Sequence, residues 1–124
     1  MNPLIPSRVL KKSIVGSAMI ESIMSIPLIL GLLFFAIHLS LLTIAKNITQ
    51  WACYQTARTL LAHSAHQSLA MNQARHILKQ IPVKKGSPRF NITDSEQYVT
   101  VSIHQPVSAL GRSYEIDETF SLYR

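Results

Sequence analysis

The chain has 124 residues, of which 48% are hydrophobic and only 15% charged, and its formal net charge is +6. This length favours one small domain with accessory segments, and the low charged content indicates that one segment is membrane-like. The single cysteine, Cys53, excludes an internal disulfide and makes a cysteine-based zinc site implausible. The clustered cations are divided between an amino-terminal leader and a later loop and form no stripe, so a nucleic-acid partner is not expected.

The amino-terminal part indicates a leader followed by a membrane span. Residues Met1–Val15 contain two prolines and a basic cluster and predict a short, poorly structured cytoplasmic leader; the cations are Arg8, Lys11 and Lys12. The segment Ser22–Ala45 contains no Asp, Glu, Lys or Arg. As a helix it would rise roughly 36 Å, which exceeds a hydrocarbon core of about 30 Å. The leader cations predict a cytoplasmic amino end, with everything after Lys46 outside.

Two residues inside this span have unusual chemistry. Pro27 removes a backbone hydrogen bond, so we expect a kink or a soft turn there. A softened helix could help the chain leave the bilayer, although membrane helices also tolerate proline without such a role. His38 is the titratable group within the span, and we expect a neutral imidazole bonded to a nearby carbonyl.

The helical pattern continues beyond the membrane. Residues 47–81 contain neither Gly nor Pro, and their apolar side chains recur every three or four positions. This predicts a long amphipathic helix that is bent or split near residues 64–68, where the pattern weakens, and that ends at Pro82. The segment Val83–Arg89 then predicts a loop.

The carboxy-terminal third alternates in the manner of strands. Residues 98–104 place Val99, Val101 and Ile103 on one face, and residues 114–122 alternate in the same way. We expect a hairpin with a turn region at 105–111, and Glu115, Asp117 and Glu118 on its solvated side. A lone hairpin is marginal in water, so its apolar face should pack on the helix. The predicted fold class is α+β: a long N-terminal transmembrane helix continuing into an amphipathic helix, with a small C-terminal antiparallel β-hairpin packed on it.

The most informative motif is G-S-A-M-I-E at residues 16–21, which lies between the basic leader and the apolar run. An ordinary signal peptide has a shorter apolar core with a small-residue cleavage site after it, whereas here the small residue, Gly16, comes first. This order resembles the prepilin family. The resemblance implies that a membrane aspartyl peptidase cuts after Gly16, that Ser17 becomes the new amino terminus, and that Glu21 is the fifth mature residue.

A closer resemblance is to the TadE-like pseudopilin family of tight-adherence (Flp-type) pilus systems. It is carried by E-S-I-M-S-I-P-L, in which the acid precedes a proline by six residues, and by Y-Q-T-A-R-T-L-L-A after the span. The resemblance implies three segments: a cleaved leader (1–16), a transmembrane and assembly helix (17–45), and an extracytoplasmic α+β head (46–124). It also implies a minor pseudopilin in the bacterial inner membrane, in or at the tip of a pilus. Its partners would be prepilin peptidase, other pilins and pseudopilins, the inner-membrane platform proteins and the lipid bilayer.

Glu21 supports a hypothesis about assembly. An isolated carboxylate in hydrocarbon either takes up a proton or is driven out. Cleavage after Gly16 would free an ammonium group on Ser17, and the ammonium of a neighbouring subunit could neutralise Glu21. Such a pair would fix the register between helices, which is the best-supported role of a buried ion pair. In the alternative interpretation, Glu21 extends to the cytoplasmic headgroups.

No pattern in the sequence predicts catalysis, a cofactor or a metal site. His63, His66 and His76 lack a nearby carboxylate or cysteine, which makes them a poor set of metal ligands. No nucleophile and base pair, phosphate loop or carboxylate pair is recognisable, so an enzyme is not expected. Two alternatives to the pilus subunit are an uncleaved single-pass accessory protein of an envelope complex, and a minor pseudopilin of a type II secretion or type IV pilus system.

Overall fold

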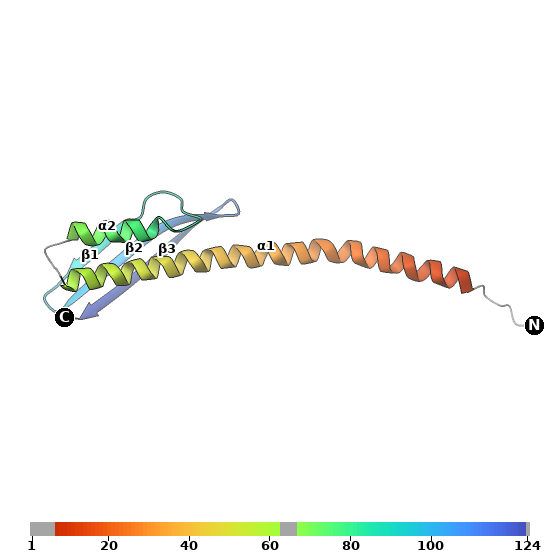
Figure 1. Cartoon of the computed structure of the whole chain (residues 1–124), viewed down its shortest axis with the longest axis horizontal. Helices are drawn as coiled ribbons and strands as arrows, with labels where there is room; N and C mark the ends of the chain where they lie inside the picture. The colour runs from red at the N-terminus through yellow and green to blue at the C-terminus, as the bar shows by residue number, and fades with distance from the viewer. Residues whose placement is uncertain (1–6, 63–66, 124) are drawn as a thin grey trace, which may run out of the picture. The chain divides into compact units, whose positions relative to one another are not determined.

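A computed structural model describes residues 7–62 and 67–123, with side chains from Gly16 onward except that of Ala18 (Figure 1). The chain forms two helices followed by three strands: α1 (Ser7–Ala62), α2 (Gln67–Leu78), β1 (Arg89–Asp94), β2 (Tyr98–Ala109) and β3 (Arg112–Tyr123). It divides into two compact units, an amino-terminal one that ends at Ile37 and a second one, here called the head, that begins at His38. The long apolar helix, second helix and antiparallel sheet confirm the predicted α+β class.

The sheet of the head is antiparallel, with the strand order β1-β2-β3. β2 pairs with β3 along its whole length, from Tyr98 opposite Tyr123 to Ala109 opposite Arg112. β1 is shorter and covers only the first half of β2. The second half of β2 instead bonds to the segment after α2, where Lys84 bridges Val107.

The two faces of the sheet differ sharply in polarity. Alternate residues of β2 are buried: Val99, Val101, Ile103, Gln105, Val107 and Ala109. The intervening residues form polar pairs across to β3, in which Thr100 bonds Ser121 at 2.8 Å and Ser102 bonds Thr119 at 2.9 Å. This alternation confirms the predicted apolar face of residues 98–104, because successive side chains of a strand point to opposite sides.

The helix packs on the sheet through small residues. Its buried positions recur every three or four residues: Ala45, Thr49, Ala52, Cys53, Thr56, Ala57 and Leu60. Six of them have small side chains; we call all seven, including the larger Leu60, the small-residue face. Short side chains allow a helix to approach a strand closely, and the Cys53 sulfur lies 3.4 Å from the backbone oxygen of Glu118 on β3. The buried threonines donate their hydroxyls to carbonyls four residues earlier, so their polar groups are satisfied inside the helix.

α2 completes the apolar layer. Ala70, Ala74 and Leu78 are buried at four-residue spacing, and Ala70 and Leu78 join the same cluster as the small-residue face. Two backbone bonds of the tighter 3₁₀ type close the helix end, from Gln80 to Ile77 and from Ile81 to Leu78. The chain then turns before Pro82, as predicted.

Several predicted boundaries were wrong. The backbone is already helical from Ser7, although residues 1–15 read as an unstructured leader, because no proline lies between residue 7 and Pro27. The helix predicted over residues 47–81 is divided into α1 and α2, as the weak patch near residues 64–68 suggested, and residues 63–66 lie outside the described part. The predicted turn region at 105–111 is mostly strand, because Pro106 is tolerated within β2 and only Leu110 and Gly111 form the turn.

Two further differences concern the strands. Strand β1 was not predicted, because its sequence R-F-N-I-T-D is short and carries few apolar residues. The prediction that Glu118 lies on the solvated side was also wrong. Glu118 is opposite the buried Ile103 and therefore shares its face, and its side chain is only 17% exposed. Acid at three of four successive positions concealed the period of two, so the strand looked polar on both sides there.

Candidate processing and assembly site

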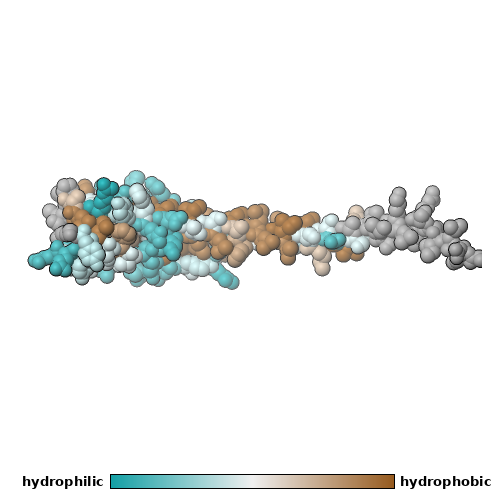
Figure 2. Space-filling model, turned by 90° about the horizontal axis from the view of Figure 1, so that it is seen from below, coloured by the Kyte–Doolittle hydropathy of each residue, from teal (hydrophilic) through white to brown (hydrophobic). Residues whose placement is uncertain are grey.

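The apolar part of α1 before the head has no covering layer. Among the described residues, one helix is long and apolar enough to span a membrane. Thirteen of its side chains between residues 19 and 37 are large, hydrophobic and 46% or more exposed, from Met19 to Ile37. Figure 2 shows this apolar surface as a brown run along α1, in contrast to the mostly teal head. Such a surface is unfavourable in water, so it indicates membrane anchoring.

Gly16 and Ser17, the predicted cleavage pair, lie within α1 and are both exposed. A Cβ atom built on Gly16 would meet no atom within 4 Å, and its φ is not positive. Glycine inside a helix costs about 1 kcal/mol relative to alanine. Neither packing nor backbone conformation therefore requires glycine at position 16 in the described structure, which leaves recognition by another protein as a reason for it.

Glu21 is exposed on α1, one helical turn beyond Ser17. Its backbone carbonyl accepts a hydrogen bond from Ser25 Oγ at 2.7 Å. Among the side chains that the structure describes, none forms an ion pair with its carboxylate. The carboxylate is therefore free to pair with a group supplied by another molecule, such as a lipid headgroup or a second subunit.

The remaining predicted residues of this segment are Pro27 and three leader cations. α1 continues through Pro27 without interruption. The side chains of Arg8, Lys11 and Lys12, the predicted topology signal, lie outside the described part of the chain. The prediction for these four residues stays a prediction.

His38 belongs to the head and bonds to a side chain, which the sequence analysis did not foresee. Its Nε2 lies 3.1 Å from the hydroxyl of Tyr114 on β3, and the two rings are 5.5 Å apart. The expected carbonyl partner is replaced by a strand that is distant in sequence. No local signal could have identified Tyr114.

A second polar group that sequence reasoning missed joins α1 to β3. Glu118 accepts a hydrogen bond from Gln50 at 3.2 Å and lies 3.8 Å from the ammonium of Lys46. Cys53 lies beneath it, 1% exposed. Burial raises the pKa of the Cys53 thiol from its ordinary value of 9.0 to about 11, and the nearby Glu118 charge adds to this effect. The thiol is therefore neutral and poorly reactive at physiological pH.

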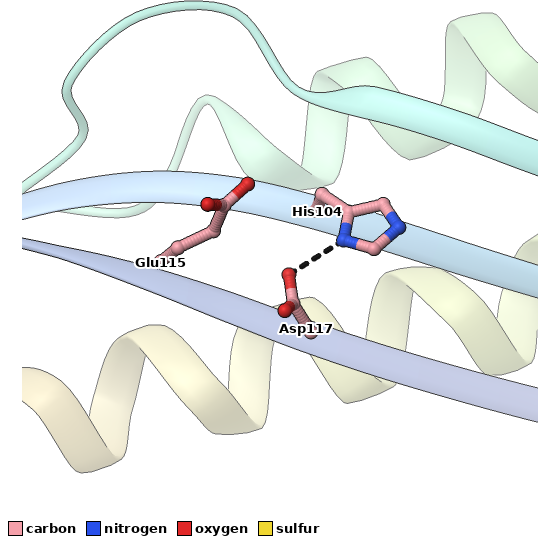
Figure 3. A group of neighbouring side chains, drawn as sticks. All are labelled: His104, Glu115 and Asp117. Carbon is pink, nitrogen blue, oxygen red and sulfur yellow. Dashed lines mark hydrogen bonds and ion pairs between the residues drawn. The ribbon is translucent and has the colours of Figure 1, made fainter.

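The open face of the sheet carries three side chains that could act as metal ligands: His104, Glu115 and Asp117 (Figure 3). His104 Nδ1 lies 2.6 Å from an oxygen of Asp117, directly across the β2–β3 pair. Arg89 of β1 is opposite His104 on its other side, so a cation here would meet an adjacent positive charge. We interpret the group as a cross-strand polar pair on an exposed face, which is worth little in stability.

A comparison with protein families found a match that covers this region. Residues 16–58 match the family described as TadE-like protein. The chain has no significant match among curated proteins or among solved structures. The matched segment begins at Gly16, includes Glu21 and Pro27, and contains most of the small-residue face. The match over residues 16–58 thus agrees with the resemblance to the TadE-like family that the sequence suggested.

Proposed function

We propose that this protein is a minor pseudopilin of a tight-adherence pilus, processed by a prepilin peptidase between Gly16 and Ser17. The TadE-like match over residues 16–58 supports a protein associated with this pilus. The observation that carries the finer proposal is the combination of an exposed apolar helix with a carboxylate, Glu21, that has no ion-pair partner among the described side chains. The leader cations favour a cytoplasmic amino end in the bacterial inner membrane and a head outside.

Assembly would depend on the charge created by cleavage. The new ammonium group of Ser17 lies one helical turn, about 6 Å, from Glu21 of the same helix. A neighbouring pilin or pseudopilin at the same depth would offer its own terminal ammonium to this carboxylate. Because an unpaired charge in hydrocarbon is expensive, the helices would associate only in the register that pairs them. The platform proteins would hold the subunits while this register forms.

The substitution Glu21→Gln tests this role. It removes the charge but keeps the size of the side chain, so we expect normal membrane insertion and loss of co-purification with other pilus subunits. Glu96→Gln is the matched control, because Glu96 is an exposed acid in the turn between β1 and β2. Unchanged co-purification of the Glu21→Gln protein would reject the pairing role.

One observation favours a second candidate, the uncleaved single-pass accessory protein. α1 runs through Gly16 and Ser17 as continuous helix, so a peptidase would have to unwind it before cutting. If the helix stays intact in the membrane, the leader stays attached and the head would act as a docking module. The mass of the membrane-bound protein separates the two candidates, because only processing removes residues 1–16.

A further inference from the structure

The turn that joins β2 to β3 contains an unusual residue. Leu110 has a φ of 48° and Gly111 a φ of 77°, as in the two-residue turns with positive φ at both central positions. Among the described residues, Leu110 is the single non-glycine residue with positive φ. Asn and Gly adopt this conformation readily, whereas a bulky side chain is strained in it. Leu110 is nevertheless 60% exposed, so the packing of the head does not explain why a leucine is here.

The turn lies at the end of the head where α1 enters it. β3 runs alongside α1 in the same direction: Tyr114 contacts His38, Glu118 contacts Lys46, and Phe120 contacts Tyr54. Residues that precede Tyr114 are therefore at the His38 end of the head. The turn between β1 and β2, which contains Glu96, lies at the opposite end of β2 (Figure 1). The twelve residues of β2 separate the two turns by about 36 to 40 Å, at about 3.3 Å per residue.

Exposed cations lie on the same end of the sheet as the β2–β3 turn. Arg112 follows it at the start of β3, and Lys84 and Lys85 are held beside β2 by backbone bonds from Lys85 to Pro106 and from Ser108 to Val83. The ammonium of Lys85 also donates to Ser113 Oγ at 2.7 Å. The carboxylate on this end of the sheet is Glu115, which is opposite Pro106. Among the described residues at this end, three cations and one acid leave an excess of positive charge.

Along the chain, the head begins where the segment long enough to cross a membrane ends. Leu42 packs against the apolar cluster of the head and Ala45 is fully buried, so these residues of the predicted span are covered by protein. The 21 residues from Ser17 to Ile37 rise about 31 Å, which already matches a hydrocarbon core of about 30 Å. The segment that matches the hydrocarbon core thus ends at Ile37, and the next residue, His38, contacts Tyr114 on the strand that follows the β2–β3 turn.

We propose that this end of the head rests on the outer surface of the bilayer, with Leu110 inserted at the headgroup boundary and Lys84, Lys85 and Arg112 beside lipid phosphates. The proposal rests on the membrane anchoring in the proposed function but not on processing or pilus assembly. An exposed apolar side chain at an end of the sheet that also carries exposed cations suits an anionic bilayer surface, where each nearby cation contributes to binding. Because α1 holds the head at the membrane, even this small contact acts at high effective concentration.

The test uses the full chain, which has a single tryptophan, Trp51. In a Trp51→Phe background, the substitution Leu110→Trp places a fluorescent probe at the turn, and Glu96→Trp places a matched probe at the far end of the sheet. Each protein is reconstituted at high dilution into vesicles of phosphatidylcholine and phosphatidylglycerol that carry bromine near the top of the acyl chains. We expect strong quenching of the probe at position 110 and none at position 96.

A third probe distinguishes failure of the surface contact from failure of membrane anchoring. Phe34→Trp, also in the Trp51→Phe background, reports insertion of the apolar helix. If the position 34 probe is quenched and the position 110 probe is not, the surface contact is wrong while membrane anchoring stands. If neither is quenched, the anchoring itself is wrong. Quenching at position 110 that appears only when the chains are crowded would place a neighbouring protein at the turn and overturn the lipid contact.

The substitution Leu110→Asn tests the contact without adding a large aromatic residue. Asparagine suits the positive φ, so the midpoint of thermal unfolding in detergent should rise by about 2–4 °C. In vesicles, the same protein should expose the turn, so that trypsin cuts after Arg112 several-fold faster than in the parent chain. A purely structural role for Leu110 predicts slower cleavage in both settings, and that result would contradict the proposal.

Discussion

The close packing of α1 on the sheet makes a quantitative prediction for Ala52. This residue is fully buried, and the neighbouring Cys53 sulfur lies only 3.4 Å from the backbone of β3, so the helix cannot move closer or accept a larger side chain without shifting. The substitution Ala52→Leu should therefore destabilise the head by about 1–3 kcal/mol through overpacking. For a unit of this size, each kcal/mol lowers the midpoint of thermal unfolding by about 4–8 °C. The expected decrease is thus roughly 4–20 °C.

The assay is thermal unfolding of the full chain in detergent micelles, followed by near-ultraviolet circular dichroism, which reports packing around the aromatic residues of the head. Ala62→Leu is the matched control, because it makes the same change on the same helix at an exposed position. We expect the control to change the midpoint by no more than about 2 °C, since exposed substitutions away from special features have small effects. Equal midpoints for Ala52→Leu and Ala62→Leu would refute the tight packing around Ala52.

Three further predictions concern single residues. Cys53 should react with maleimide far more slowly in the folded than in the unfolded chain at pH 8, because its folded thiol has a pKa of about 11. As the pH rises, the thiol of the unfolded chain loses its proton before the thiol of the folded chain does. The free energy of unfolding of the head should therefore decrease between pH 9 and 11, and the substitution Cys53→Ala should remove the thiol's contribution to this decrease. Glu118→Gln should cost about 0.5 kcal/mol, measured by the same unfolding assay, and the difference should shrink in high salt because Lys46 is exposed; an unchanged cost in salt would contradict an ionic contribution. Gly16→Ala should leave the folded helix intact or stabilise it by up to about 1 kcal/mol and yet block processing, whereas Gly31→Ala should be processed normally; cleavage of both variants, read from a gel shift, would remove the recognition role of Gly16.

Most of the structure of the amino-terminal half could be predicted from the sequence. A run without formal charge and a three-to-four residue period are local signals, and they predicted the helical character of α1 and the apolar segment that the structure leaves exposed. The alternation of Val99, Val101 and Ile103 likewise predicted the buried face of β2, because a strand encodes its two faces in consecutive residues.

The parts that could not be predicted depend on contacts between distant segments. Tyr114 contacts His38, and Glu118 contacts Lys46, because β3 runs alongside α1. No local sequence pattern encodes the direction in which β3 runs relative to α1. The residues of β1 have weak strand propensity of their own, and they form a strand because they pair with the edge of β2. Leu110 was overlooked because a leucine in a turn with positive φ goes against the usual turn composition, where Asn or Gly is expected.

The central claim, that cleavage creates the charge that Glu21 needs, is tested most directly by the intact mass of the protein recovered from membranes of cells with and without a prepilin peptidase. Processing predicts a product that lacks residues 1–16 and begins at Ser17 when the peptidase is present, and the full-length chain when it is absent. A protein that begins at Met1 in both strains would contradict the account, because the amino group that is proposed to neutralise Glu21 would never form.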